Sequence, residues 1–165
     1  EALIELVAES LRDAFMQQSI DRPRAHLSAA ERMELEFVDF RELALEKPEI
    51  LLVFSELMER GRRDDRIAEA ILPMKHRWRQ ILADLLTEGV SDGVYRPDID
   101  PEAFATVMIA TFIGFCRNPQ KDADRFERLV AELRRSIQNP AFAASADLSI
   151  STGSARHPGG PVSKE

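Results

Sequence analysis

Histidine, cysteine and carboxylate side chains often act in catalysis or bind metal ions. In this chain their spacing along the sequence suits neither role. His26, His76 and His157 lie far apart, and none has a partner at the i, i+4 spacing of a helical metal site. Cys116 is the single cysteine, and the sequence has no C-x-x-C, no G-x-S-x-G and no glycine-rich phosphate loop. The sequence therefore predicts no catalytic residue, no metal ligand and no cofactor, which argues against an enzyme.

Large apolar side chains are more informative, because they recur on four predicted helices and must all face a fifth. The commoner role of such residues is a solid core, but a set this large also suits a pocket for a small apolar ligand. The candidate ligand-binding residues are Phe15, Met16, Phe37, Phe40, Phe54, Met58, Met74, Trp78, Ile109, Phe112 and Ile113. We expect an aromatic or multi-ring ligand of drug size, with His76 or Asp39 as candidates to orient it.

The composition is that of one globular domain. The chain has 165 residues, of which 44% are hydrophobic and 31% are charged. A single cysteine excludes an internal disulfide, and the absence of a secretory or long apolar segment predicts a cytoplasmic protein without a membrane partner. The formal net charge of -7 argues against direct nucleic-acid binding, which needs a basic face.

Hydrophobic periodicity predicts an all-α bundle of about six helices and no strand. Ser28 and Glu31 have the spacing of a capping box, and Pro73 is expected to kink or split the fourth helix. The period is lost from Ala141 onward, which predicts a helical domain over 1–140 and a flexible tail over 141–165. The expected helices cover 2–18, 28–46, 48–61, 64–88, 100–116 and 121–138.

The helix expected over 100–116 organises the rest of the chain. Asp100 is a good N-cap. Pro101 suits the first helical position, because an N–H at that position would have no hydrogen-bond partner within the helix. The following residues are apolar on nearly every side, so the helix should be buried on several faces. It is too short to span a bilayer, which favours a core or a subunit interface.

Two apolar stripes, one on this helix and one on the helix over 121–138, predict a two-fold homodimer, because a monomer would expose too much apolar surface. The candidate interface residues are Phe104, Val107, Met108, Thr111, Phe115, Phe126, Leu129, Val130, Leu133 and Ile137.

The run Leu-Leu-Thr-Glu-Gly-Val-Ser-Asp-Gly-Val-Tyr-Arg-Pro-Asp-Ile-Asp-Pro-Glu over 85–102 resembles the C-terminal regulatory domain of the TetR family of bacterial transcriptional repressors. The shared pattern is a helix, G-x-x-x-G, an aromatic residue, arginine and then D-P-E. Gly114, the Lys-Pro-Glu of 47–49 and the Glu-Ala-Leu of 1–3 match further positions of the family. The resemblance covers residues 1–140.

This resemblance implies a dimer in which the last two helices of each subunit form a four-helix bundle, and an inducer pocket enclosed by the preceding helices. A small hydrophobic effector would shift the first helix, which in the family leads from the DNA-binding module, and so release operator DNA. The three-helix module with the helix-turn-helix is absent from these residues, so operator DNA would be bound only through that missing module.

Two alternatives of other classes stay open at this stage. A ligand-free scaffold or adaptor bundle would use the same helices with a solid core. A small all-α enzyme would need polar groups that converge in a cavity, and the sequence has none at useful spacing. An apolar cavity would favour the effector-binding domain over the scaffold, and turnover of a bound compound would favour the enzyme.

Overall fold

In the computed structural model, which describes residues 6, 7, 10, 11, 13 and 24–141, every long element is a helix. The described residues before position 14 are helical as well, and the only β-type pairing among described residues is an isolated bridge. The all-α prediction is therefore confirmed, with a helix count close to six. The named helices are α2 (Ala29–Leu45), α3 (Pro48–Arg60), α4 (Asp65–Ser91), α5 (Pro101–Arg117) and α6 (Ala123–Ile137).

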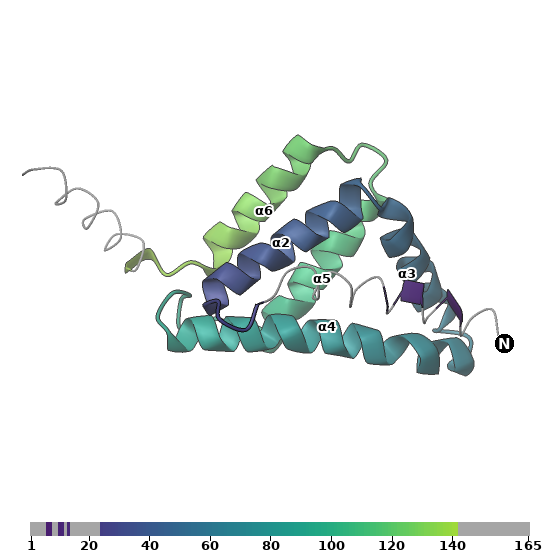
Figure 1. Cartoon of the computed structure of the whole chain (residues 1–165), viewed down its shortest axis with the longest axis horizontal. Coiled ribbons are helices and arrows are strands. Elements are labelled where there is room, and N and C mark those ends of the chain that lie inside the picture. Colours follow the sequence, from purple (N-terminus) through teal and green to yellow (C-terminus); the bar gives the residue numbers. More distant parts are fainter. Residues whose placement is uncertain (1–5, 8–9, 12, 14–23, 142–165) are drawn as a thin grey trace, which may run out of the picture.

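The long helix α4 runs along one side of the helical bundle (Figure 1). It packs against α2, α3 and α5, and α5 crosses behind α2 and α4 in this view. Helix α6 lies along α2 and reaches α5 through Phe126, whose ring contacts Phe112 and Phe115. One continuous apolar core results, and Leu11 of the N-terminal helical residues is buried in it.

Local capping signals set most helix ends where the sequence predicts them. The Ser28 hydroxyl accepts from the Glu31 backbone N–H while the Glu31 carboxylate accepts from the Ser28 N–H, which completes the capping box of α2. Asp100 caps α5 by accepting from the Ala103 N–H at 3.0 Å. Pro48 and Pro101 each occupy the first turn of their helices, where a proline costs no hydrogen bond.

Helix α4 is continuous through Pro73, so of the two expected effects of the proline the split is wrong, and the kink stays a prediction. A proline inside a helix removes one backbone hydrogen bond and costs about 3 kcal/mol in isolation. Pro73 itself is exposed, so water can solvate the carbonyl that it frees. Burial of Ile67, Ile71 and Trp78 on both sides of the proline offsets the loss.

The link between α4 and α5 is fastened to the end of α6. The Arg96 N–H donates to the Ile137 carbonyl and the Asn139 N–H donates to the Val94 carbonyl, each at 3.0 Å. Tyr95 between these bonds is buried, and its ring lies directly on Gly89 of α4. A Cβ added at Gly89 would lie 2.1 Å from Tyr95 Cδ2, so only glycine leaves room for the ring.

Replacing Gly89 by alanine is therefore expected to lower the free energy of unfolding by about 1–3 kcal/mol, because overpacking displaces a buried ring. The matched control is Gly114→Ala in α5, where a Cβ meets nothing within 4 Å and alanine favours the helix. Urea unfolding of both variants measures the effect. Equal stability of the two would show that Tyr95 does not lie against Gly89.

Burial also raises the pKa of two weak acids, that of the Cys116 thiol to about 11 and that of the Tyr95 phenol to about 12. Both groups ionise more readily in the unfolded chain, so they stabilise the fold while protonated, and this stability is lost as pH rises above the unfolded values of 9.0 and 10.0. We expect the free energy of unfolding to fall by roughly 1–2 kcal/mol between about pH 8 and pH 10.5 through Cys116 alone. The decline should be shallower in Cys116→Ala, and an unchanged decline would contradict the assignment.

Several expectations concern residues outside the described ranges. The predicted tail lies there from residue 142 onward, and the division into a domain over 1–140 and a tail stays a prediction.

Within the part of the chain that the structure describes, none of the helices combines the length and apolar character needed to cross a membrane.

Candidate ligand-binding site

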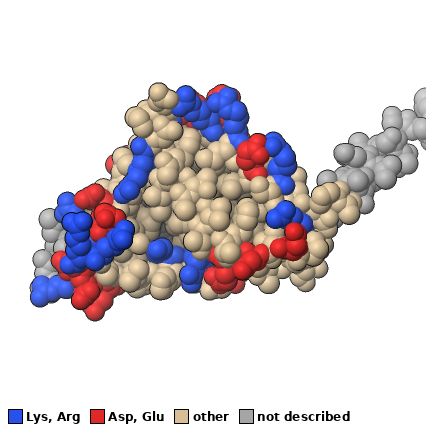
Figure 2. Space-filling view, turned by 180° about the vertical axis from the view of Figure 1, so that it is seen from behind, with Lys and Arg blue, Asp and Glu red and all other residues tan. Residues whose placement is uncertain are grey.

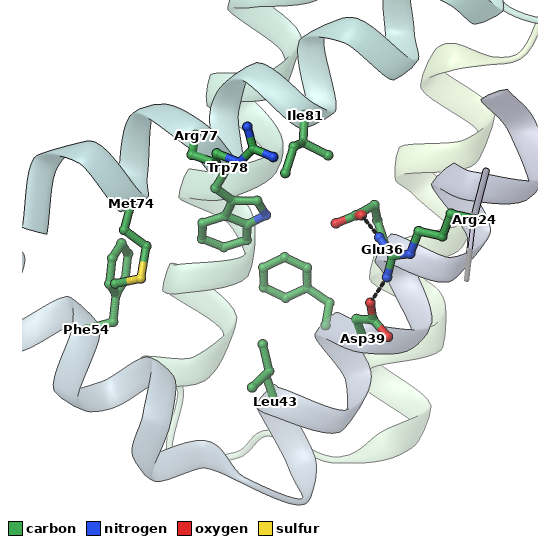
Figure 3. A pocket seen from close by; sticks show the side chains of 10 residues that line it. Arg24, Glu36, Asp39, Leu43, Phe54, Met74, Arg77, Trp78 and Ile81 are labelled. Carbon is green, nitrogen blue, oxygen red and sulfur yellow. Dashed lines mark hydrogen bonds and ion pairs between the residues drawn. The ribbon is translucent and has the colours of Figure 1, made fainter. Parts of the chain in front are cut away.

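A cavity of about 90 Å³ lies between α2, α3 and α4 (Figure 3). We call it the central cavity. Four of the predicted ligand-binding residues line it, namely Phe40, Phe54, Met74 and Trp78, together with Asp39. The full lining is Arg24, Glu36, Asp39, Phe40, Leu43, Phe54, Met74, Arg77, Trp78 and Ile81.

One wall of the central cavity is a cluster of aromatic rings that joins α2, α3 and α4, with α5 behind it. The Phe40 ring stacks on Trp78 with centroids 4.7 Å apart and on Phe112 with centroids 3.7 Å apart. Phe54 meets Trp78 edge-on at 6.2 Å. Because each ring is fixed by its neighbours, the wall offers preformed apolar surface and π faces to whatever enters the cavity.

The opposite wall is charged. The Arg24 guanidinium donates to the Glu36 and Asp39 carboxylates (Figure 3), which are only 7% and 6% exposed. Burial raises the pKa of Glu36, and the charge of Arg24 opposes that shift. Buried carboxylates need a partner of opposite charge, and a residue from the segment before α2 supplies it.

Arg24 was not among the sequence-predicted site residues, although a signal for it exists in α2. Glu36 falls on the apolar face of that helix, between Met33 and Phe40, where an acidic side chain must be buried and therefore paired. Asp39 was a candidate and lines the cavity, whereas His76 is exposed and lines neither cavity described in this section.

The remaining candidate ligand residues are distributed elsewhere. Phe37, Ile109 and Phe112 are core residues that do not line the central cavity, and Phe112 supports Phe40 from behind. Met58 and Ile113 line a wider groove of about 490 Å³ between α3, α4 and α5, which also contains Phe54. Phe15 and Met16 lie outside the described residues.

The candidate dimer residues divide into buried and accessible groups. Most of the candidates are buried within their own subunit and therefore offer a partner little surface. Whether they take part in an interface stays a prediction. Phe104, Thr111 and Leu129 are half-buried, and Val107 is 50% exposed. The buried group is Met108, Phe115, Phe126, Val130, Leu133 and Ile137.

The accessible side of α5 is uncharged along its length. Between Glu102 and Arg117 the helix has no charged residue, and Figure 2, which views the molecule from the side on which α5 lies, shows Lys, Arg, Asp and Glu gathered around an uncharged centre. We call this surface the α5 face. Its exposed residues are Ala103, Thr106, Val107, Ala110 and Gly114.

The described helices thus form a bundle whose central cavity has one aromatic and one charged wall, and whose α5 face is uncharged. On the charged wall Arg24 contacts both carboxylates, and no three His, Cys, Asp or Glu side chains gather as a metal site among the described residues. The arrangement is suited to binding and contains no evident catalytic constellation within those residues.

Comparisons with known proteins agree with this architecture. Residues 52–137 match the family described as tetracyclin repressor-like, C-terminal domain, and the chain belongs to this family of transcriptional regulators. The fold is similar to the solved structure of the ketosteroid transcriptional regulator KstR2 of Mycobacterium tuberculosis, with a TM-score of 0.66 and 19% sequence identity. The alignment covers 82% of this chain and 72% of that one. No curated protein matches the sequence significantly. The TetR resemblance of residues 85–102 is thus confirmed.

Proposed function

We propose that this regulatory domain binds a small lipophilic effector in the central cavity and so controls operator release by a TetR-like repressor. The observation that carries the proposal is the preformed aromatic wall, which faces a buried ion-pair cluster of Arg24 with Glu36 and Asp39. Membership of the family supports a regulatory role.

The volume of the central cavity limits the ligand. At about 90 Å³ it is smaller than the roughly 150 Å³ apolar cavity that holds benzene. A ligand of drug size therefore fits only if the cavity enlarges. The residue most easily moved is Arg24 of the charged wall, because it belongs to no helix, whereas Glu36, Asp39 and the aromatic rings all lie on helices.

A ligand that moves Arg24 would also act on the N-terminal part of the chain. Arg24 follows the helical residues that include Leu11, which packs in the same core. In the proposed intact protein this N-terminal helix leads from the DNA-binding module. Ligand binding would weaken operator binding only by its preference for the altered state, typically about 1–3 kcal/mol.

Titration of the chain with neutral and charged lipophilic compounds tests the proposal. Trp78 is the only tryptophan, so a compound that enters the central cavity should quench its fluorescence and raise the melting temperature. Calorimetry should show that Trp78→Ala and Phe40→Ala weaken binding at least tenfold, whereas Leu52→Ala, an exposed change on α3, should not. The proposal fails if no compound raises the melting temperature, or if the cavity variants bind as well as the control.

The second part of the proposal is a homodimer formed through the α5 face. The outer side of this helix is uncharged over four turns, and its small residues Ala103, Ala110 and Gly114 permit close approach of a second helix. Uncharged patches of this kind on a subunit mark interaction sites. A two-fold axis would place the same face of both subunits together.

The small cavity volume also supports one alternative, a dimerisation scaffold that binds no ligand. The same titration separates the two functions. A scaffold predicts dimerisation through the α5 face without any stabilisation by lipophilic compounds.

A further inference from the structure

We propose that the effector is a lipophilic cation, whose ammonium, amidinium or guanidinium group takes the place of the Arg24 guanidinium on Glu36 and Asp39. This inference rests on the proposed function, because it assigns a chemical class to the ligand of the central cavity. Arg24 then acts as an internal occupant of the effector site, and effector binding is an exchange of one cation for another.

Charge balance at the cavity wall favours a cation over other ligands. Glu36 and Asp39 are both more than nine-tenths buried, and Arg24 contacts both. A neutral ligand that displaced Arg24 would separate two buried carboxylates from this partner, at a large desolvation cost. An anion would add a further negative charge beside them. A cation at the same position restores the interaction that Arg24 makes.

The rest of the lining suits the body of such a ligand. Phe40, Phe54 and Trp78 present aromatic rings, which attract a cation that is close to their faces and has lost its water. Leu43, Met74 and Ile81 complete an apolar wall for hydrocarbon or ring systems. Arg77 is the other cation of the lining and lies beside Trp78 on α4 (Figure 3), across the cavity from the two carboxylates.

Arg24 is also replaceable without moving a helix. It precedes the N-cap Ser28, and among the described residues its backbone carbonyl accepts from the Leu27 N–H at 3.1 Å. Its buried Nε has no hydrogen-bond partner in the described structure, so the site does not satisfy this guanidinium completely. Departure of the side chain would add its own volume to the 90 Å³ of the cavity.

Three ligands of nearly the same shape and different charge test the inference: 2-naphthamidine, 2-naphthamide and 2-naphthoate, titrated calorimetrically into the whole chain at pH 7. We expect the amidine to bind at least tenfold more tightly than the amide, and the naphthoate to bind most weakly. The inference is overturned if the amide equals the amidine, or if the naphthoate binds most tightly, which would show that Arg24 and Arg77 hold an anion. It is also overturned if the amidine does not bind.

These outcomes are distinct from failure of the proposed function. Binding of the amide or of other neutral lipophiles, sensitive to Trp78→Ala, would preserve the effector site while rejecting a cationic effector. Absence of binding by every lipophile would reject both.

Variants of the charged wall provide a second test of the inference. Arg24→Gln removes the internal competitor, so the preference for the amidine over the amide should rise at least fivefold. The double variant Glu36→Gln, Asp39→Asn should lose the preference for the amidine. Glu34→Gln is the matched control for Glu36→Gln, because Glu34 lies on the same helix and pairs with Arg134 at the surface. If the double variant does not fold, Arg24→Gln decides alone, and an unchanged or lower preference for the amidine overturns the inference.

Discussion

Replacing Val107 by arginine is expected to raise the dissociation constant of the proposed homodimer at least about 100-fold, which corresponds to about 3 kcal/mol. Val107 is 50% exposed in the middle of the α5 face. A two-fold axis through this face would bring both arginines into the interface, where each charge loses water without gaining a partner. Sedimentation at micromolar concentration should then show a monomer. The helix content of the variant should be unchanged.

Val38→Arg is the matched control for this experiment. Val38 lies on α2 and is 47% exposed, so the same substitution there changes charge and side-chain size equally. It should leave the dimer intact. If instead Val38→Arg separates the subunits and Val107→Arg does not, the interface uses the α2 side. A wild-type chain that sediments as a monomer would reject the dimer altogether. Substitution of Phe126 or Leu133 is a poorer test, because both are buried within the subunit and their loss would unfold it.

Phe112→Ala is expected to lower the free energy of unfolding by about 3–5 kcal/mol, the range for removing a buried phenylalanine ring. The Phe112 ring is 1% exposed and lies between Phe37 and Phe40 of α2 and Phe126 of α6, with its closest centroid distance 3.7 Å, to Phe40. Its removal leaves a cavity that three helices must close. Urea denaturation measures the loss.

Leu52→Ala is the control for Phe112→Ala. Leu52 is 42% exposed on α3, and its truncation should cost less than about 1 kcal/mol. Similar losses for the two variants would contradict the central position of the Phe112 ring. Because Phe112 supports Phe40 from behind, the Phe112→Ala variant should also bind neutral lipophiles more weakly.

Helix positions were predictable because their signals are local. The Ser28 and Glu31 capping box, the Asp100 cap and the prolines at helix starts act over three or four residues, and the structure has them as predicted. Pro73 is the exception among local signals, since packing on both sides holds α4 together across it. Propensity decides helix ends, and tertiary burial can override it within a helix.

The rotation of α5 could not be predicted in the same way. The helix is apolar on nearly every side, so periodicity does not identify which side faces the core. The structure buries Met108 and Phe115, which were grouped with Val107 as interface candidates, and exposes Val107 alone of the three. Packing against α2, α4 and α6 makes that choice.

The sequence by itself determined an all-helical fold, the capped starts of α2 and α5, and, through its family resemblance, the class of domain. Only the tertiary structure decided which of the aromatic residues line the central cavity, and that Arg24 lines it beside Glu36 and Asp39. Arg24 is separated from Glu36 by 12 residues and from Asp39 by 15. Such contacts depend on how the chain turns before α2, and no periodic pattern records that geometry, because periodicity reports only which residues share a face of one helix.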